Sequence, residues 1–119
     1  MNENTEPARD MPLVLIESPY AGDVDKNTAY ARACMRDSLH RGEAPFAMHL
    51  LYTQPGILND SVPRERNWGI EAGLSWGKFA EITAVYSDLG ITPGMEIGIK
   101  RAIQEGRKIE YRELAGWSQ

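Results

Sequence analysis

The sequence has few of the side chains that bind metals or form covalent cross-links. It contains one cysteine, Cys34, and two histidines in 119 residues. A single cysteine excludes an internal disulfide and is typical of a reducing compartment. So few thiol and imidazole groups argue against a transition-metal site. We therefore expect a protein that needs no metal and no other cofactor, with Cys34 as a buried, inert thiol.

An excess of basic residues and a long apolar run are also missing. The chain has 13 Lys and Arg against 17 Asp and Glu, a net charge of −4. This balance argues against nucleic acid as a partner, because neutralising phosphates requires a basic face. No apolar run approaches the ~20 residues that cross a membrane, and the first ten residues lack the layout of a secretion signal. We predict a flexible lead-in over residues 1–10 and one domain over residues 11–119.

Short apolar segments alternate with longer segments of helical period. The strands predicted from the apolar segments are 11–16, 44–48, 81–86 and 107–111. The helices predicted from the periodic segments are 25–41, 61–76 and 93–105. This alternation is typical of an α/β three-layer sandwich, with a mainly parallel sheet and right-handed crossovers. The sheet is expected to have four strands, or five if residues 50–58 add another.

The second predicted helix has an unusual composition. Gly69 and Gly73 lie four residues apart on one face. Glycine inside a helix costs about 1 kcal/mol relative to alanine, so this spacing indicates close approach of another element or of a subunit. Trp68 and Trp76 lie near one face of the same helix and are expected in the core or at an interface.

Polar side chains follow three of the predicted strands. Because the carboxyl ends of parallel strands share one edge of the sheet, the loops after these strands are expected to form a common rim. The first loop contributes Ser18, Tyr20 and Asp23, the second His49, Tyr52 and Gln54, and the third Ser87, Asp88, Thr92 and Glu96. The sequence therefore predicts a ligand site at this rim.

A series of short motifs resembles the nucleoside 2-deoxyribosyltransferase-like superfamily, most closely its small bacterial and phage branch. The motifs are Ser18-Pro19-Tyr20-Ala21-Gly22, Asn27, Pro45-Phe46-Ala47-Met48-His49-Leu50-Leu51, Asp60, Arg64-Glu65-Arg66, Gly69 and Thr92-Pro93-Gly94-Met95-Glu96-Ile97. They extend over residues 13–111. No single motif is highly specific, and their order and spacing carry the resemblance.

The resemblance implies a flavodoxin-like, Rossmann-like fold, usually in homo-oligomers, in the cytoplasm of a bacterium or of an infected host cell. Characterised members of the family cleave the N-glycosidic bond of a deoxynucleoside or nucleotide. A glutamate attacks the anomeric carbon, and a base or water then takes the sugar. The partner implied for this chain is a small-molecule nucleoside or nucleotide, with no nucleic acid and no membrane.

The resemblance also assigns roles to individual residues. The run from Gly94 to Gly98 (GMEIG) matches the Gly-Met-Glu-Leu-Gly run of the transferases, which implies Glu96 as the nucleophile. Asp88 is implied as the acid that helps to protonate the leaving base, and Tyr20 as the residue that orients the glutamate. The rim and the resemblance together indicate a substrate-binding set of Ser18, Pro19, Gly22, His49, Gln54, Arg66, Ser87, Gly90, Thr92, Gly94 and Met95.

These residue types suit the reaction. Cleavage of an N-glycoside builds positive charge on the sugar, which a carboxylate stabilises or bonds to. A second carboxyl with a raised pKa donates a proton to the base. The free N–H groups of a helix start suit a hydroxyl or a phosphate.

One position departs from the pattern of the phage-type branch. There the glutamate more often follows the Gly-Met pair by three residues, a place that Gly98 occupies here. Two positions on a helix differ by roughly 200° of rotation, so Glu96 and a residue at 98 are not interchangeable. Two interpretations stay open: Glu96 is the nucleophile, or the cavity binds a nucleotide or an ADP-ribose-like signal without catalysis. Glu96 also suits the dipole of a helix start, and Asp88 a turn.

Overall fold

The computed structural model describes residues 10–117, so nearly all of the predicted lead-in lies outside the described residues. The strands are β1 (Leu13–Glu17), β2 (Ala44–Phe46), β3 (Ile82–Tyr86) and β4 (Lys108–Arg112). The helices are α1 (Val24–His40), α2 (Met48–Leu51), α3 (Pro63–Gly77) and α4 (Pro93–Gln104). Each predicted strand and helix is present. Within this part of the chain, no helix is both long and apolar enough to cross a membrane.

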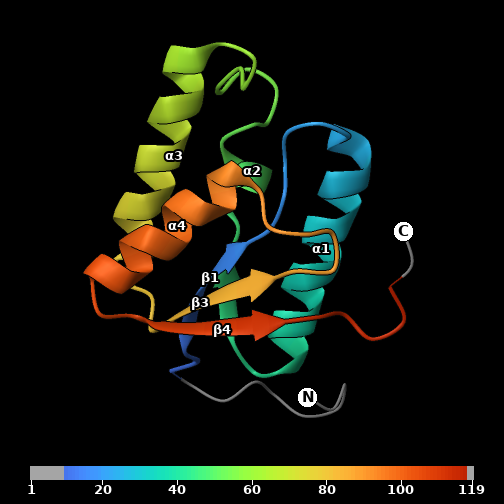
Figure 1. Ribbon diagram of the computed structural model, residues 1–119, viewed down its shortest axis with the longest axis vertical. Helices are drawn as coiled ribbons and strands as arrows, with labels where there is room; N and C mark the ends of the chain where they lie inside the picture. Colours follow the sequence, from blue (N-terminus) through green and yellow to red (C-terminus); the bar gives the residue numbers. More distant parts are fainter. Residues whose placement is uncertain (1–9, 118–119) are drawn as a thin grey trace.

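All four strands run parallel, in the order β2-β1-β3-β4 (Figure 1). The chain passes from β1 through α1 to β2, and then crosses to the other side of β1 to add β3 and β4. Connections therefore leave β1 and β3 in opposite directions. Such a switch point opens a crevice at the carboxyl ends of the strands. Residues 50–58 add no fifth strand, because this segment completes α2 and continues in turns.

Alternation along β1 places its side chains in two layers. Val14 and Ile16 are buried with Cys34 of α1, and burial raises the pKa of the Cys34 thiol to about 12. Leu15 points toward α3, since a Cβ atom added at Gly77 would lie 2.7 Å from its Cδ2. Helix α1 thus covers one face of the sheet, and α3 and α4 cover the other (Figure 1). The predicted α/β three-layer sandwich is confirmed.

Two glycines allow α3 to contact the connection that precedes it. A Cβ atom at Gly73 would lie 2.6 Å from Cβ of Met48, and one at Gly69 would lie 3.2 Å from Cδ1 of Leu58. Real Cβ atoms do not approach a neighbour as closely as the first of these distances. The element that the glycine spacing predicted is therefore α2 and the loop after it, from the same chain. This packing holds the β2–α3 connection over the carboxyl end of the sheet.

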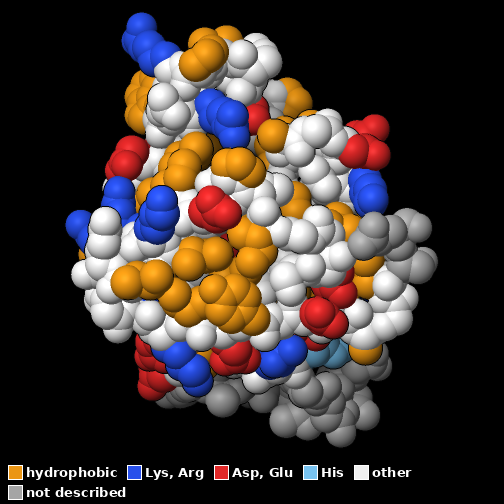
Figure 2. All heavy atoms as spheres, viewed as in Figure 1, with side chains coloured by type: hydrophobic (Ala, Val, Ile, Leu, Met, Phe, Trp, Pro, Cys, Tyr) orange, Lys and Arg blue, Asp and Glu red, His pale blue; other side chains and the backbone are white. Residues whose placement is uncertain are grey.

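Apolar side chains remain on the surface. Trp68 and Trp76 of α3 are each 63% exposed, so neither is in the core of the described chain. Figure 2 shows further apolar side chains gathered over α4 and β4, and Ile103 and Tyr111 of these two elements are exposed. A monomer gains nothing by exposing large apolar groups together, and such surfaces are typical of contacts between proteins.

Candidate functional site

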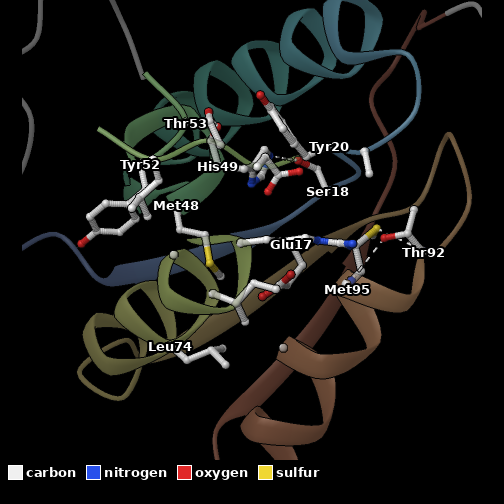
Figure 3. A pocket seen from close by; sticks show the side chains of 18 of the residues that line it. Glu17, Ser18, Tyr20, Met48, His49, Tyr52, Thr53, Leu74, Thr92 and Met95 are labelled. Atoms are coloured by element: carbon white, nitrogen blue, oxygen red, sulfur yellow. Dashed lines mark hydrogen bonds between the residues drawn. The ribbon is translucent and has the colours of Figure 1, made fainter. Parts of the chain in front are cut away.

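A cavity of about 230 Å³ lies at the switch point, between the carboxyl end of β1 and the helices α2, α3 and α4. Its lining comes from the β1–α1 loop, from residues 48–60, from the inner side of α3 and from the first turns of α4 (Figure 3). The loops after β1 and β2 and the start of α4 therefore meet, as the sequence predicted. Helix α3 supplies a fourth wall.

Glu17 is the carboxyl group at the floor of this cavity. It is the last residue of β1 and lies two positions after Leu15, on the same face of the sheet. Its side chain therefore points toward α3 and α4. Its residue is 4% exposed, and Oε2 has no hydrogen-bond partner among the described residues. Burial raises the pKa of Glu17 to about 8, although the positive charge of Arg107 acts in the opposite direction. Glu17 is therefore mostly protonated and uncharged at neutral pH.

Glu17 occupies the space of a side chain that α4 lacks. A Cβ atom added at Gly98 would lie 3.0 Å from Oε1 of Glu17 and would overlap Oε2. Gly98 is buried and lines the same cavity. The absence of a side chain at residue 98 is thus what admits the Glu17 carboxyl to the floor.

Ser18 and His49 form a second polar pair in the cavity. Ser18 Oγ lies 2.9 Å from His49 Nε2, within hydrogen-bonding distance. Burial lowers the pKa of His49 to about 4, so its imidazole is neutral at neutral pH. The ring of Tyr20 lies 6.0 Å from the imidazole, centroid to centroid, in a tilted arrangement (Figure 3). The polar groups deep in the cavity are therefore uncharged hydrogen-bonding groups.

The walls are apolar and the mouth is charged. The apolar wall residues are Met48, Leu58, Ile70, Leu74 and Met95. Asp60 and Arg66 add charge where the cavity continues into a shallow hollow beside the β1–α1 loop, and Glu65 adds charge to the cavity lining. Arg66 reaches the start of α4, because a Cβ atom at Gly94 would lie 4.0 Å from its Nη2. No hydrogen bond or ion pair joins the Arg66 guanidinium to any other described residue.

The start of α4 is largely satisfied by its own cap. Thr92 Oγ1 accepts a hydrogen bond from the backbone N–H of Met95 at 3.2 Å. Pro93 has no N–H, and the N–H of Glu96 bonds to the Thr92 carbonyl. Among the N–H groups of this turn, only that of Gly94 has no hydrogen bond to a described residue. Arg66, more than the helix start, is thus the cation available to an anion at the mouth.

The structure brings together part of the set that the sequence indicated. The predicted residues that line the cavity are Ser18, Tyr20, His49, Tyr52, Arg66, Thr92, Gly94 and Met95. Gly22 lines the adjoining hollow. The predicted residues outside the cavity lining are Pro19, Asp23, Gln54, Ser87, Asp88, Gly90 and Glu96. Gln54, for example, donates its amide to the carbonyl of Leu50 at 2.7 Å.

Glu96 does not face the cavity. It is exposed, in the first turn of α4. Gly98 points at Glu17, and a rotation of roughly 200° over two helical positions directs Glu96 to the opposite side of α4. The carboxyl group at the floor therefore comes from β1 and not from the GMEIG run.

Asp88 lies on the other face of the sheet, where it joins three segments. Its carboxylate accepts a hydrogen bond from the Tyr30 hydroxyl at 2.5 Å, and the Leu114 N–H lies 3.0 and 3.1 Å from its two oxygens. The Asp88 N–H in turn donates to the Tyr30 hydroxyl. Asp88 thus ties α1 and the segment after β4 to the β3–α4 loop, and it does not line the cavity.

The sequence contains a signal for Glu17. The predicted strand ends at Ile16, whereas β1 extends to Glu17. A glutamate at the carboxyl end of an otherwise apolar buried strand is unusual, because a buried carboxyl is costly unless it is neutralised or paired. Across residues 10–117, no three His, Cys, Asp or Glu side chains are grouped to hold a metal ion.

Comparison with known proteins adds the family. Residues 12–112 match the family described as "Domain of unknown function (DUF7768)". No curated protein matches the chain.

Proposed function

We propose that this chain, which belongs to the DUF7768 family, binds a nucleoside or nucleotide in the cavity and cleaves its N-glycosidic bond. The sugar passes to water, or to a second base in a deoxyribosyl transfer. The observation that supports this best is the combination of an apolar cavity with uncharged hydrogen-bonding groups at its deep end.

The deep end suits a heterocyclic base. A base is planar and apolar on its faces and carries hydrogen-bonding groups at its edge. Neutral His49, Ser18 and protonated Glu17 can pair with such an edge without placing a charge against it. An anion at this depth would gain no ion pair. The cavity of about 230 Å³ lies below the ~300–1,000 Å³ range of drug-sized sites, which favours a mononucleoside over a dinucleotide.

The mouth suits the sugar and a 5′-phosphate. Arg66 has no ion-pair partner among the described residues, and its guanidinium lies beside Gly94. Guanidinium groups bind phosphates through two parallel hydrogen bonds. Asp60 and Glu65 at the same rim offer acceptors for sugar hydroxyls. We therefore expect a nucleoside 5′-monophosphate to bind with its base inward and its phosphate at Arg66.

The test is release of free base. Purified protein is incubated with ribo- and deoxynucleosides and with their 5′-monophosphates, and the products are separated by liquid chromatography. We expect base release from at least one of them. If no base is released from any while binding is measurable by calorimetry, the proposed cleavage is refuted.

A second candidate is a protein that binds a nucleotide, or an ADP-ribose-like signal, without turning it over. The observation that favours it is the place of Glu96 outside the cavity, with Gly98 where the phage-type branch more often has glutamate. Native mass spectrometry of the protein as purified separates the two functions. An intact nucleotide retained in the protein supports binding alone.

We also propose that the protein works as a homo-oligomer in the cytoplasm. The exposed Trp68 and Trp76 on α3 and the apolar surface over α4 and β4 (Figure 2) support self-association. Sedimentation velocity tests this proposal, and a monomer at micromolar concentration would refute it.

A further inference from the structure

We propose that Glu17 is the catalytic acid of the cavity, which delivers its proton from strand β1 to the departing base. This inference rests on the proposed cleavage of an N-glycosidic bond and assigns its central residue. It also gives a reason for the glycine at residue 98. The carboxyl has not been lost from the site but enters it from the neighbouring strand.

Glu17 has no structural task that would explain its burial. A buried carboxyl that stabilises a fold is normally held by an ion pair or by hydrogen bonds. Glu17 forms no ion pair within the described chain, and its Oε2 accepts and donates no hydrogen bond there. The nearby Arg107 directs two of its nitrogens elsewhere, since its Nε bonds to Thr83 at 2.8 Å and its Nη1 to Glu105 at 2.7 Å. Its Nη2, like Oε2 of Glu17, is buried without a hydrogen-bond partner among the described residues.

Glu17 lines the cavity, and packing against Gly98 confines its carboxyl. Glu17 lines the cavity floor beside Ser18 and His49. Gly98 closes against it from α4, so the carboxyl fills the space that a side chain at residue 98 would take. An unpartnered, buried carboxyl directed into a ligand-sized cavity is typical of a functional acid.

The surroundings of Glu17 also set its protonation state. The charged or titratable groups around Glu17 are Tyr20 of the β1–α1 loop, His49 of α2, Tyr52 after α2, Asp60 before α3, Glu65 and Arg66 of α3, and Arg107 before β4. Helix α4 contributes no charge to the cavity lining. His49 is uncharged at neutral pH, and burial outweighs Arg107 in setting the pKa of Glu17. Glu17 therefore holds a proton at the pH at which it would act.

The reaction then balances with Glu17 and water alone. The Glu17 carboxyl transfers its proton to a ring nitrogen of the base while the C1′–N bond breaks, and the bonding electron pair leaves with the base. Water attacks C1′ of the oxocarbenium sugar. The Glu17 carboxylate takes the proton that this water releases. Free base and free sugar leave, and Glu17 is protonated again.

The experiment compares base release by three variants, each with one glutamate replaced by glutamine, on the same substrate. Glu17→Gln keeps the size and hydrogen-bonding capacity of the side chain but has no proton to give. Glu96→Gln tests the alternative carboxyl of α4. Glu81→Gln, an exposed glutamate at the opposite end of the sheet, is the matched control. Base release is measured by chromatography and ligand affinity by calorimetry, with a deoxynucleoside and its 5′-monophosphate.

We expect Glu17→Gln to reduce base release by about a hundredfold or more, the usual contribution of a general acid, with ligand affinity changed by no more than about twofold. A second variant, Glu17→Ala with Gly98→Glu, returns a carboxyl to the same space from α4. We expect it to recover part of the lost rate.

Three results would overturn the inference, and each rejects a different part of the mechanism. Base release that survives in Glu17→Gln removes Glu17 from the reaction and leaves the proposed cleavage intact. Loss of base release in Glu96→Gln alone assigns the role to Glu96. A wild-type protein that binds nucleosides and releases no base refutes the cleavage itself, and the acid role with it.

Discussion

The contact between Glu17 and Gly98 is open to a test that needs no substrate. In Gly98→Ala, the new methyl group would lie 3.0 Å from Oε1 of Glu17 and would overlap Oε2. The carboxyl must move, and the variant loses about 1–3 kcal/mol through overpacking. Replacing glycine with alanine inside a helix returns about 1 kcal/mol. The net change expected for Gly98→Ala alone is a destabilisation of roughly 0–2 kcal/mol.

The sign should reverse when the carboxyl is removed. In a Glu17→Ala background, the methyl group at residue 98 meets no carboxyl, so only the helix term remains and Gly98→Ala stabilises by about 1 kcal/mol. The two substitutions are therefore coupled by roughly 1–3 kcal/mol. Substitutions at independent sites usually add to within about 0.5 kcal/mol.

Urea unfolding of wild type, Gly98→Ala, Glu17→Ala and the double variant, followed by circular dichroism, measures this coupling. Gly94→Ala is the matched control in the same helix, because its Cβ atom would make only an ordinary contact, 3.9 Å from Thr92 Oγ1. Its combination with Glu17→Ala should be additive. A coupling between residues 17 and 98 of less than about 0.5 kcal/mol would refute the placement of Glu17 against Gly98, and with it the structural basis of the catalytic proposal.

Three further predictions concern other contacts. Because the pKa of Glu17 rises from 4.5 in the unfolded chain to about 8 in the fold, the folded state keeps a proton that the unfolded state has lost between these values. The contribution of Glu17 to the free energy of unfolding should then be largest below pH 4.5 and fall toward pH 8 by at most about 1.4 kcal/mol per pH unit. Asp37 and Glu43, whose pKa values the fold lowers, act in the opposite direction in acid, so the quantity to measure is the difference between wild type and Glu17→Gln. That difference in urea-unfolding free energy should change with pH between 4.5 and 8, and a difference independent of pH would contradict this. Asp88→Ala removes the acceptor of the Tyr30 hydroxyl and of the Leu114 N–H. We expect the free energy of unfolding to fall by about 1–3 kcal/mol and the Leu114 amide to exchange its hydrogen faster. Unchanged exchange at Leu114 would count against Asp88 as the group that holds this segment. Arg66→Ala should weaken binding of a 5′-monophosphate by about tenfold or more, the value of a charged hydrogen bond, and spare the nucleoside; calorimetry that finds equal losses for both ligands would remove the phosphate from Arg66.

The sequence by itself determined the order of strands and helices, the parallel sheet and the edge at which the loops meet. These features follow from the apolar period of each segment and from the connections between strands, which are local properties of the chain. It also predicted Ser18, Tyr20, His49 and Arg66 as members of one site, and the structure brings all four to the cavity.

Only the tertiary structure decided which carboxyl enters the cavity. Residues 96 and 98 differ in direction on α4, and the rotation of that helix against β1 turns Gly98 inward and Glu96 toward solvent. Glu17 and Gly98 fit together only when a strand end and a helix far along the chain meet. Likewise, Asp88 is held by Tyr30 and Leu114, two contacts that no local motif specifies. The burial that keeps Glu17 protonated comes from this packing, and the motif at Glu96 does not encode it.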